Sequence, residues 1–246
     1  MRYFLAVAIA MSIASAKFVA HIDTVDKKLQ RKMINGGSWK KGCPVPIKDL
    51  RDLKMSYIGF DGKEHMGELI VHKSVAREVV DIFKDLYEQR YPIRKMEPIY
   101  RYGGSDFASI EADNTSAFNC RPVTGGKKWS RHSYGKAIDI NPIENPYISR
   151  SGRISHKKSL VFRDRKRKNE KDARYRAMLL PHDKAVTAFK KRGWRWGGDW
   201  HTIKDYQHFD KPRNIDTKPE NNTKIPAKVS SKSVGALFRG LDKKRQ

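Results

Sequence analysis

A short stretch of the chain combines a histidine, an aspartate and small residues. His132 and Asp139 stand seven residues apart within WSRHSYGKAIDINP, residues 129–142. If residues 137–141 form a strand, its two isoleucines face one side and Asp139 faces the other. Gly135 allows a turn before this strand, so the two polar side chains can converge. A structural Asp–His hydrogen bond would give the same pattern, so this pair alone does not establish a site.

A second segment, DYQHFD, adds another histidine and another carboxylate. Asp205 and His208 are three residues apart, so one tight turn places them on the same side. With His132 and Asp139, His208 completes two histidines and one carboxylate, the ligand set of a catalytic zinc ion with an open fourth position. Asp205 is then the further carboxylate that can act as general base. The sequence has no H-E-x-x-H motif, which excludes a thermolysin-like site.

Other histidines could compete for the role of ligand. Most are interpreted as surface or loop residues, because none has a carboxylate at comparable spacing near a glycine-punctuated strand. His201, in GGDWHTIKD, is the candidate for a substrate contact or an alternate ligand. The competing set is His65, His72, His156, His182 and His201.

The elements that must position these residues indicate an α+β fold. Two strand-like runs within residues 53–72 flank Asp61-Gly62, which is typical of a two-residue hairpin turn. Residues 74–90 and 181–194 have the apolar spacing or the capping residues of helices. Strands and helices without regular alternation predict a small, mainly antiparallel sheet flanked by helices.

Both ends of the chain differ in composition from the middle. Residues 1–16 combine a positive residue, an apolar run and an A-x-A cleavage motif, which predicts a signal peptide; an uncleaved anchor is the alternative. Residues 17–34 predict a polar, mobile or loosely docked arm, and residues 213–246 a basic, disordered tail. We therefore expect an exported protein, periplasmic or secreted, without a transmembrane segment once the signal is removed.

Two cysteines, Cys43 and Cys120, are present. In an oxidising compartment an even pair predicts one disulfide. Two buried thiols, or Cys120 as a metal ligand, are the alternatives.

The net charge of +25 bears on the partners of the protein. Such a charge favours polyanions, which for an exported protein are envelope polymers, bound here through the basic tail. The sequence has no zinc-finger, RNP or helix-turn-helix signature, so no specific nucleic-acid partner is expected. The basic segment 162–176 is interpreted as a solvated loop that could shape substrate access.

Several motifs in order resemble the zinc D-alanyl-D-alanine carboxypeptidase family. SRHSYGKAID (residues 130–139) matches S-x-H-x-x-G-x-A-x-D, and DYQH (residues 205–208) matches (D/E)-x-x-H. The runs TSAFNCR, AIDINPIENPY and GWRWGGDW are similar to a carboxypeptidase-like branch of that family. The family includes vancomycin-resistance D,D-peptidases and L-alanyl-D-glutamate endopeptidases. The resemblance covers about residues 42–210.

The resemblance implies one zinc ion on His132, Asp139 and His208, with Asp205 as the base. It also implies a zinc peptidase domain over residues 35–212 with the fold of the Hedgehog signalling domain.

The family usually places an arginine before the first histidine, near the substrate carbonyl or carboxylate. Arg121 is the better positional match and Arg101 the second. Ser130 could orient a ligand, contact substrate or only shape the turn.

The implied function is an exported zinc peptidase that hydrolyses peptidoglycan stem peptides. A D-alanyl-D-alanine carboxypeptidase is slightly favoured over a stem-peptide endopeptidase. A non-catalytic, basic envelope-binding protein is the alternative from another class, but the presence of all four expected metal-site residues argues against it.

Overall fold

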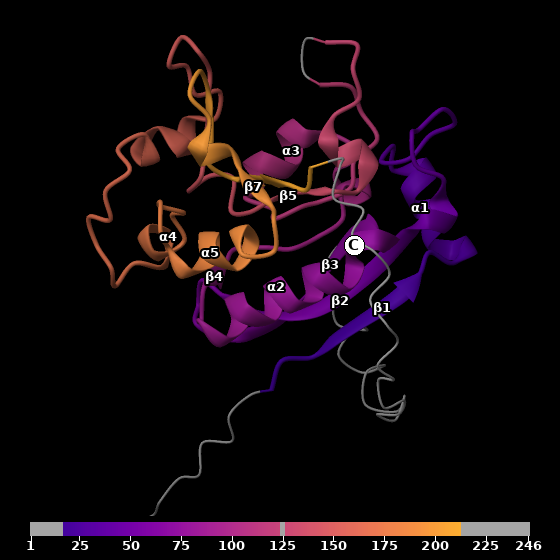
Figure 1. Ribbon diagram of the computed structural model, residues 1–246, viewed down its shortest axis with the longest axis horizontal. Coiled ribbons are helices and arrows are strands. Elements are labelled where there is room, and N and C mark those ends of the chain that lie inside the picture. Colours follow the sequence, from indigo (N-terminus) through magenta and orange to yellow (C-terminus); the bar gives the residue numbers. More distant parts are fainter. Residues whose placement is uncertain (1–16, 124–125, 213–246) are drawn as a thin grey trace, which may run out of the picture. The chain divides into compact units, whose positions relative to one another are not determined.

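The computed structural model describes residues 17–123 and 126–212. These residues form an α+β structure with small antiparallel sheets and several helices, as predicted (Figure 1). The predicted signal peptide and the predicted basic tail lie outside the described residues. Among the helices that the structure describes, none has the length and apolar composition needed to cross a membrane.

The largest sheet is built on one long hairpin. Strands β2 (Leu50–Gly59) and β3 (Glu64–His72) pair antiparallel, and β4 (Pro92–Ile93) pairs in parallel with β2. The predicted two-residue turn is longer: the Gly59 N–H donates to Lys63 O at 2.8 Å, and Gly62 within the loop has φ +72°. The hairpin is therefore where the sequence predicts it, with a different turn.

Residues 17–34, which the sequence predicts as a loosely docked arm, pack against this sheet instead. Strand β1 (Ala20–Thr24) pairs antiparallel with β2, and helix α1 (Lys27–Asn35) follows it. Met33 of α1 is fully buried in a cluster that contains Leu50, Ile70 and Phe118. One buried side chain and one strand edge thus hold a segment whose composition is mostly polar.

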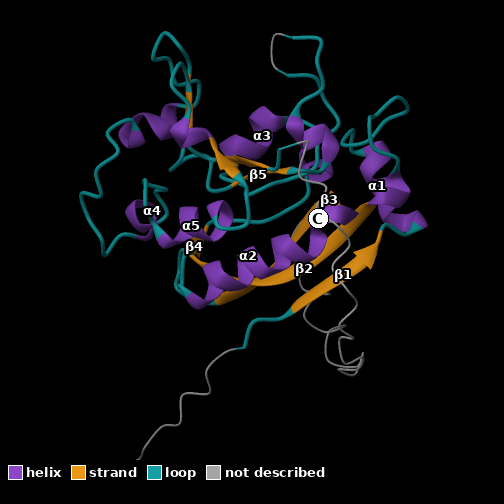
Figure 2. Cartoon of the chain, viewed as in Figure 1, coloured by secondary structure: helices purple, strands orange, loops and turns teal. Residues whose placement is uncertain are grey.

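Helices cover the large sheet and connect it to the rest of the fold. Helix α2 (Ala76–Glu88) lies across the sheet in Figure 1, and Val79, Ile82 and Phe83 point into the main core. Helix α5 (Lys184–Lys190) packs against α2. The short helices α3 (Asp106–Glu111) and α4 (Ala173–Arg176) lie in the loop-rich part that Figure 2 shows mostly in teal.

Two small sheets lie beside the large one, whereas the sequence predicts a single sheet. Strands β5 (Ala137–Asp139), β9 (His208–Asp210) and β7 (Arg195–Trp196) form an antiparallel sheet in the order β5-β9-β7. Strands β6 (Tyr147–Ile148) and β8 (Lys204–Asp205) form an antiparallel pair. Asn141, with φ +43°, bends the chain after β5, so that this strand stays short.

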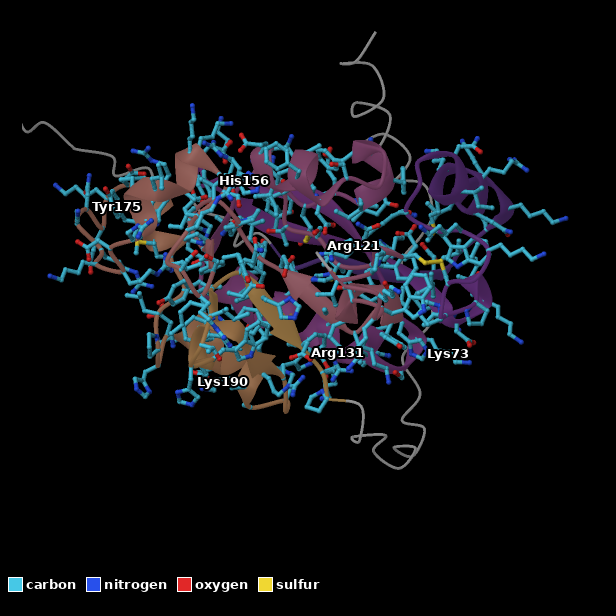
Figure 3. All side chains as sticks on the ribbon, turned by 90° about the horizontal axis from the view of Figure 1, so that it is seen from above. Lys73, Arg121, Arg131, His156, Tyr175 and Lys190 are labelled. Atoms are coloured by element: carbon cyan, nitrogen blue, oxygen red, sulfur yellow. A yellow bond between two sulfur atoms is a disulfide. The ribbon has the colours of Figure 1, made fainter. Side chains whose placement is uncertain are left out.

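Cys43 and Cys120 form a disulfide, with Cα atoms 5.8 Å apart; Figure 3 draws it as a yellow bond. It connects positions 77 residues apart beside the cluster that contains Met33. Cys120 is therefore engaged in this bond and does not serve as a metal ligand.

The basic segment 162–176 is more firmly attached than a solvated loop. Arg165 donates to the Glu144 and Leu179 carbonyls at 2.7 and 3.1 Å. Arg167 donates to the Met178 carbonyl at 2.7 Å and forms an ion pair with Asp183. Burial lowers the pKa of Arg165 to about 10. Two arginines of this segment therefore hold backbone in place, because their guanidinium groups satisfy buried carbonyls.

Candidate metal centre

His132 lies in a short 3-10 helix, Arg131–Tyr134, that the surrounding backbone holds in place. Gly135 ends it with φ +63°, and a Cβ at Gly135 would lie 2.6 Å from the His72 nitrogen. The His132 ring is buried, and its Nδ1–H donates to the Ala117 carbonyl at 2.6 Å. Since a carbonyl only accepts, this bond sets the tautomer and leaves Nε2 with a free lone pair.

Asp139 and His208 face the same point because their strands are paired. Asp139 of β5 is directly opposite His208 of β9. The side chains of directly opposed residues lie on the same face of an antiparallel sheet. Ile138 and Phe209, one position earlier and later, point to the opposite face and are fully buried in the core. Strand alternation therefore separates the polar pair from the core, as predicted.

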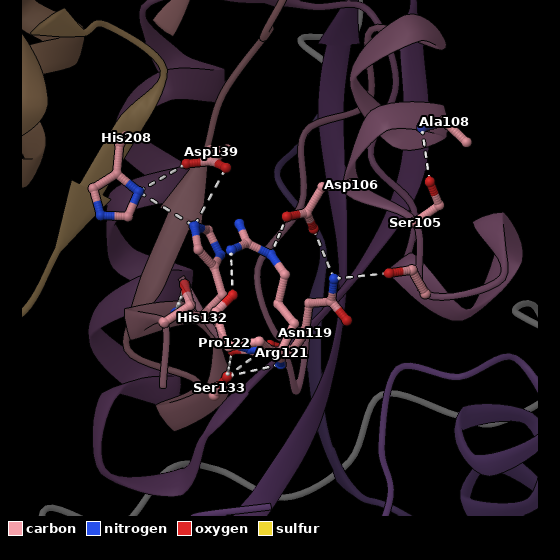
Figure 4. Close-up of polar contacts among 12 residues, drawn as sticks. Ser105, Asp106, Ala108, Asn119, Arg121, Pro122, His132, Ser133, Asp139 and His208 are labelled. Carbon is pink, nitrogen blue, oxygen red and sulfur yellow. Dashed lines mark hydrogen bonds and ion pairs between the residues drawn. The ribbon is translucent and has the colours of Figure 1, made fainter. Parts of the chain in front are cut away.

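Potential ligand atoms of three residues converge at this point (Figure 4). His132 Nε2 lies 3.2 Å from His208 Nδ1 and 3.3 Å from Asp139 Oδ2, and His208 Nδ1 lies 2.9 Å from Asp139 Oδ1. Ligand atoms around a tetrahedral ion with bonds near 2.0–2.1 Å are separated by about 3.3 Å. The three residues can therefore hold a metal ion, and they form the one such group found among the described residues.

The Asp139 carboxylate and the His208 imidazole each stabilise the charged form of the other. Burial raises the pKa of Asp139, but the charges and hydrogen bonds of His132 and His208 outweigh it and hold that pKa well below its usual range. Burial lowers the pKa of His208, but its hydrogen bond to Asp139 and the charge of that carboxylate raise it overall. An anionic carboxylate among imidazoles is the donor set that a divalent cation requires.

Asp205 lies on β8, close enough to interact electrostatically with all three residues. Its Oδ1 atom is buried and has no hydrogen-bond partner among the described residues. Burial raises the pKa of Asp205 to about 6; the positive charge of His208 opposes this shift and the negative charge of Asp139 adds to it. A carboxylate with a pKa nearer neutrality is better suited to accept and return a proton.

Residues 124–211 match the family model described as D-alanyl-D-alanine carboxypeptidase. This segment of the chain is therefore similar to the peptidases of that family. The matched segment contains His132, Asp139, Asp205 and His208, so the resemblance based on their motifs is confirmed. No solved structure matches the chain significantly, so the likeness to the Hedgehog signalling domain stays a prediction.

In the peptidase, Arg121 is held next to the turn that carries His132. Its backbone N–H donates to Ser133 Oγ at 2.9 Å, and its guanidinium forms an ion pair with Asp106 of α3 (Figure 4). Asn119 donates to the second oxygen of Asp106 at 2.7 Å. Arg121 is therefore fixed by a local network instead of being free in solvent.

The two other predicted substrate contacts lie in different settings. Ser130 is buried and its Oγ accepts the His132 N–H at 3.3 Å, which shapes the turn of the first histidine. Arg101 lies over the Tyr100 ring, and its charge acts on Glu68 of β3. These contacts join Arg101 to the large sheet.

The competing histidines have other partners or lie at the surface. His65 pairs with Asp61, His72 accepts from the Ser74 N–H, and His156 contacts Glu111 at 2.6 Å. His182 and His201 are exposed. The sequence singled out His201 as a substrate contact or an alternate ligand. Its neighbour Trp200 is the residue near the site, with its ring centre 5.6 Å from that of His208.

Some residues that support the site carry no local signal in the sequence. Asp210 is buried and accepts from Arg131 Nε at 3.0 Å and from Arg195 Nε at 3.1 Å. Arg131 precedes His132, and Asp210 lies two positions after His208 on β9. This ion pair therefore ties the two histidine-bearing segments together. Asp106 could be recognised only from the fold, because it lies 15 positions before Arg121 in the sequence.

Proposed function

We propose that the protein is a zinc metallopeptidase that hydrolyses peptidoglycan stem peptides, and that it acts as a D-alanyl-D-alanine carboxypeptidase. The convergence of His132, Asp139 and His208, with the Asp205 Oδ1 atom nearby and without a partner among the described residues, is the observation that carries this proposal. The description of the matching family supplies the substrate class.

Each residue of the centre has a proposed role. His132, Asp139 and His208 hold the zinc ion, which when bound polarises the scissile carbonyl and lowers the pKa of a water molecule. Asp205 accepts the proton of the attacking water and returns it to the leaving amine. The bond from His132 Nδ1 to the Ala117 carbonyl keeps Nε2 directed at the centre.

Arg121 is proposed to contact the substrate carbonyl or carboxylate. Its ion pair with Asp106 fixes the guanidinium, and a fixed planar donor suits an oxyanion or a terminal carboxylate. Ser130 is proposed to act through the turn that it caps, whereas Arg101, beside Glu68, has weaker support as a substrate contact.

The remaining predictions complete the proposal. We place the peptidase domain at residues 35–212, with the packed segment 17–34 as part of the same unit and a Hedgehog-like fold. The signal-like residues 1–16 support export to the periplasm or cell wall, and the basic residues 213–246 support contact with anionic envelope polymers. A stem-peptide endopeptidase is the second candidate, because the motif family contains both activities.

The proposed function is tested by mass spectrometry of purified stem peptides incubated with the protein. We expect loss of a terminal D-Ala that stops with a chelator and returns when zinc is added. Cleavage inside the stem would identify an endopeptidase instead. The absence of any metal-dependent product on stems of every length would overturn the proposal.

The Asp205→Asn variant sharpens this test. It should still bind zinc and stay folded, but kcat should fall by about 100- to 10,000-fold because the general base is lost. The matched control is Asp199→Asn, which alters an exposed aspartate six positions earlier and should retain activity. Turnover by Asp205→Asn close to that of the wild type would place the base elsewhere.

A further inference from the structure

A pocket of about 300 Å³ lies beside the segment that follows β5. Its apolar wall includes Ile143 and Phe162, which are both buried. Two buried carboxyl groups, those of Asp113 and Glu144, also line it. None of the metal-centre residues lines this pocket, so it is a separate feature of the same fold.

The Glu144 carboxyl group lacks a partner on one side. Glu144 is 1% exposed, and its Oε2 atom has no hydrogen-bond partner among the described residues. Its carboxyl group is hydrogen-bonded to that of Asp113, whose Oδ1 accepts the Ile143 N–H at 3.0 Å. An unsatisfied buried acceptor is costly, so a native structure usually supplies it with a donor.

The charge of the two carboxyl groups favours a cationic donor. Burial raises the pKa of Glu144 to about 10, and the neighbouring Asp113 adds to this shift. A hydrogen bond between two carboxyl groups requires a proton on one of them, and the other carries a negative charge when it is ionised. An ammonium group would provide both the missing donor and the compensating charge.

The rim of the pocket has the opposite charge. Three basic side chains, Arg94, Lys158 and Arg174, line its outer part. Their side chains are 52%, 65% and 53% exposed, and they form ion pairs with Asp113, Glu111 and Asp172 in that order. Arg94 Nε lies 3.9 Å from Asp113 Oδ2, which places a cation close to the buried pair. A ligand that enters this pocket thus meets cations first and carboxyl groups at the bottom.

We propose that this pocket binds a substrate side chain that ends in both an ammonium and a carboxylate, as in a diamino dicarboxylic acid residue of a stem peptide. The ammonium reaches Asp113 and Glu144, and the carboxylate reaches the basic rim. This inference rests on the proposed function, because it names the part of the stem peptide that the enzyme selects.

The segment that follows β5 connects the candidate metal centre to the pocket. Ser116 and Asp139 exchange backbone hydrogen bonds of 2.9 and 2.8 Å, and the Asp113 side chain then binds the backbone of Ile143. Glu144 lies five positions after Asp139, so their Cα atoms are at most about 18 Å apart.

The test uses three synthetic pentapeptides that end in D-Ala-D-Ala and differ only at the third residue. This residue carries an ammonium and a carboxylate in the first peptide, an ammonium alone in the second, and neither in the third. We expect kcat/KM to be about 10- to 100-fold higher for the first than for the third, as expected for a hydrogen bond to a charged group.

Two variants assign this preference to the pocket. Glu144→Gln should reduce the ratio of kcat/KM between the second peptide and the third, which reports the preference for an ammonium. Lys158→Gln should reduce the ratio of kcat/KM between the first peptide and the second, which reports the preference for the carboxylate. Glu170→Gln changes an exposed carboxylate on the same basic segment and should keep both preferences. Because the readout is a ratio between peptides, a uniform loss of activity does not affect it.

Binding of the same peptides to the metal-free protein, measured by calorimetry, tests the pocket without turnover. Equal affinity for all three peptides, or a preference that survives in Glu144→Gln, would overturn the pocket assignment. Preferential binding without metal-dependent cleavage of any peptide would overturn the proposed function and leave the pocket assignment in place.

Discussion

At the scale of single residues, the candidate metal centre depends on how each potential ligand is oriented. The Ala117 carbonyl sets the tautomer of His132, and the Asp139 carboxylate lies between the two imidazoles. Asp205 differs from Asp139 because one of its oxygens is buried without a partner, which suits a base better than a ligand. The surroundings of these two aspartates therefore differ, which is why we propose different roles for them.

Replacement of a ligand tests this arrangement directly. In His132→Ala or His208→Ala, we expect zinc affinity to fall by more than about 100-fold, because changes outside the ligand shell alone cost 10- to 100-fold. The zinc content of dialysed protein, measured by mass spectrometry, gives the answer. His201→Ala, which changes an exposed histidine, is the control. Stoichiometric zinc in either ligand variant would contradict the assignment.

At the scale of elements, a tight turn and a strand pair bring the ligands together. The 3-10 helix of His132 ends at Gly135, which packs against the end of β3, while β5 and β9 align Asp139 with His208. The Gly135 carbonyl also accepts the His72 N–H at 2.9 Å. The large sheet therefore supports the turn on which the metal centre depends.

Gly135→Ala tests this support. Gly135 has φ +63°, and the new Cβ would lie 2.6 Å from the His72 nitrogen. The matched control is Gly62→Ala, which has φ +72° but no atom within 4 Å of the new Cβ. The left-handed backbone costs roughly 1–2 kcal/mol in both variants, and the close contact costs about 1–3 kcal/mol more in Gly135→Ala. If denaturant unfolding gave both variants the same loss of unfolding free energy, the contact between Gly135 and β3 would not contribute to stability.

At the scale of the whole molecule, one core joins the large sheet to the smaller sheet of the metal centre. Leu69 and Val71 of β3 share a hydrophobic cluster with Ile138 and Phe209 of the smaller sheet. Buried carboxyl groups in the large sheet then make the stability of the whole unit depend on pH. Burial raises the pKa of Glu68 to about 7; Asp52 adds to this shift, whereas Arg101 and Lys54 oppose it.

The sign of the pH effect follows from this raised pKa. Glu68 stabilises the fold fully below its ordinary pKa of 4.5, and this contribution is lost as the pH rises through about 7. Glu68→Gln imitates the protonated form, so at pH 8 it should be more stable than the wild type by a few kcal/mol, at about 1.4 kcal/mol for each pKa unit. At pH 4 the two proteins should be alike in denaturant unfolding.

The control for this experiment is Glu88→Gln, a change of an exposed glutamate at the end of α2. It should unfold like the wild type at both pH values. A wild-type protein that is as stable as Glu68→Gln at pH 8 would show that the Glu68 carboxyl group is not destabilised by burial.

The sequence by itself determined the local patterns of this protein. Alternation placed Asp139 opposite the buried isoleucines, the spacing of Asp205 and His208 indicated a second half-site, and the ordered motifs indicated the family. These features depend on neighbouring residues, because strand alternation and tight turns act over a few positions. The hairpin and helix α2 were predicted for the same reason.

Only the tertiary structure decided which distant residues meet. It packs residues 17–34 onto the sheet through Met33, pairs Arg121 with Asp106, and places Arg101 beside Glu68. It also joins Asp113 and Glu144 in one pocket. Such contacts depend on the register of strands and on the packing of a shared core, and no local periodicity records either. The sequence therefore indicated which residues could form the candidate metal centre, and the fold decided what surrounds them.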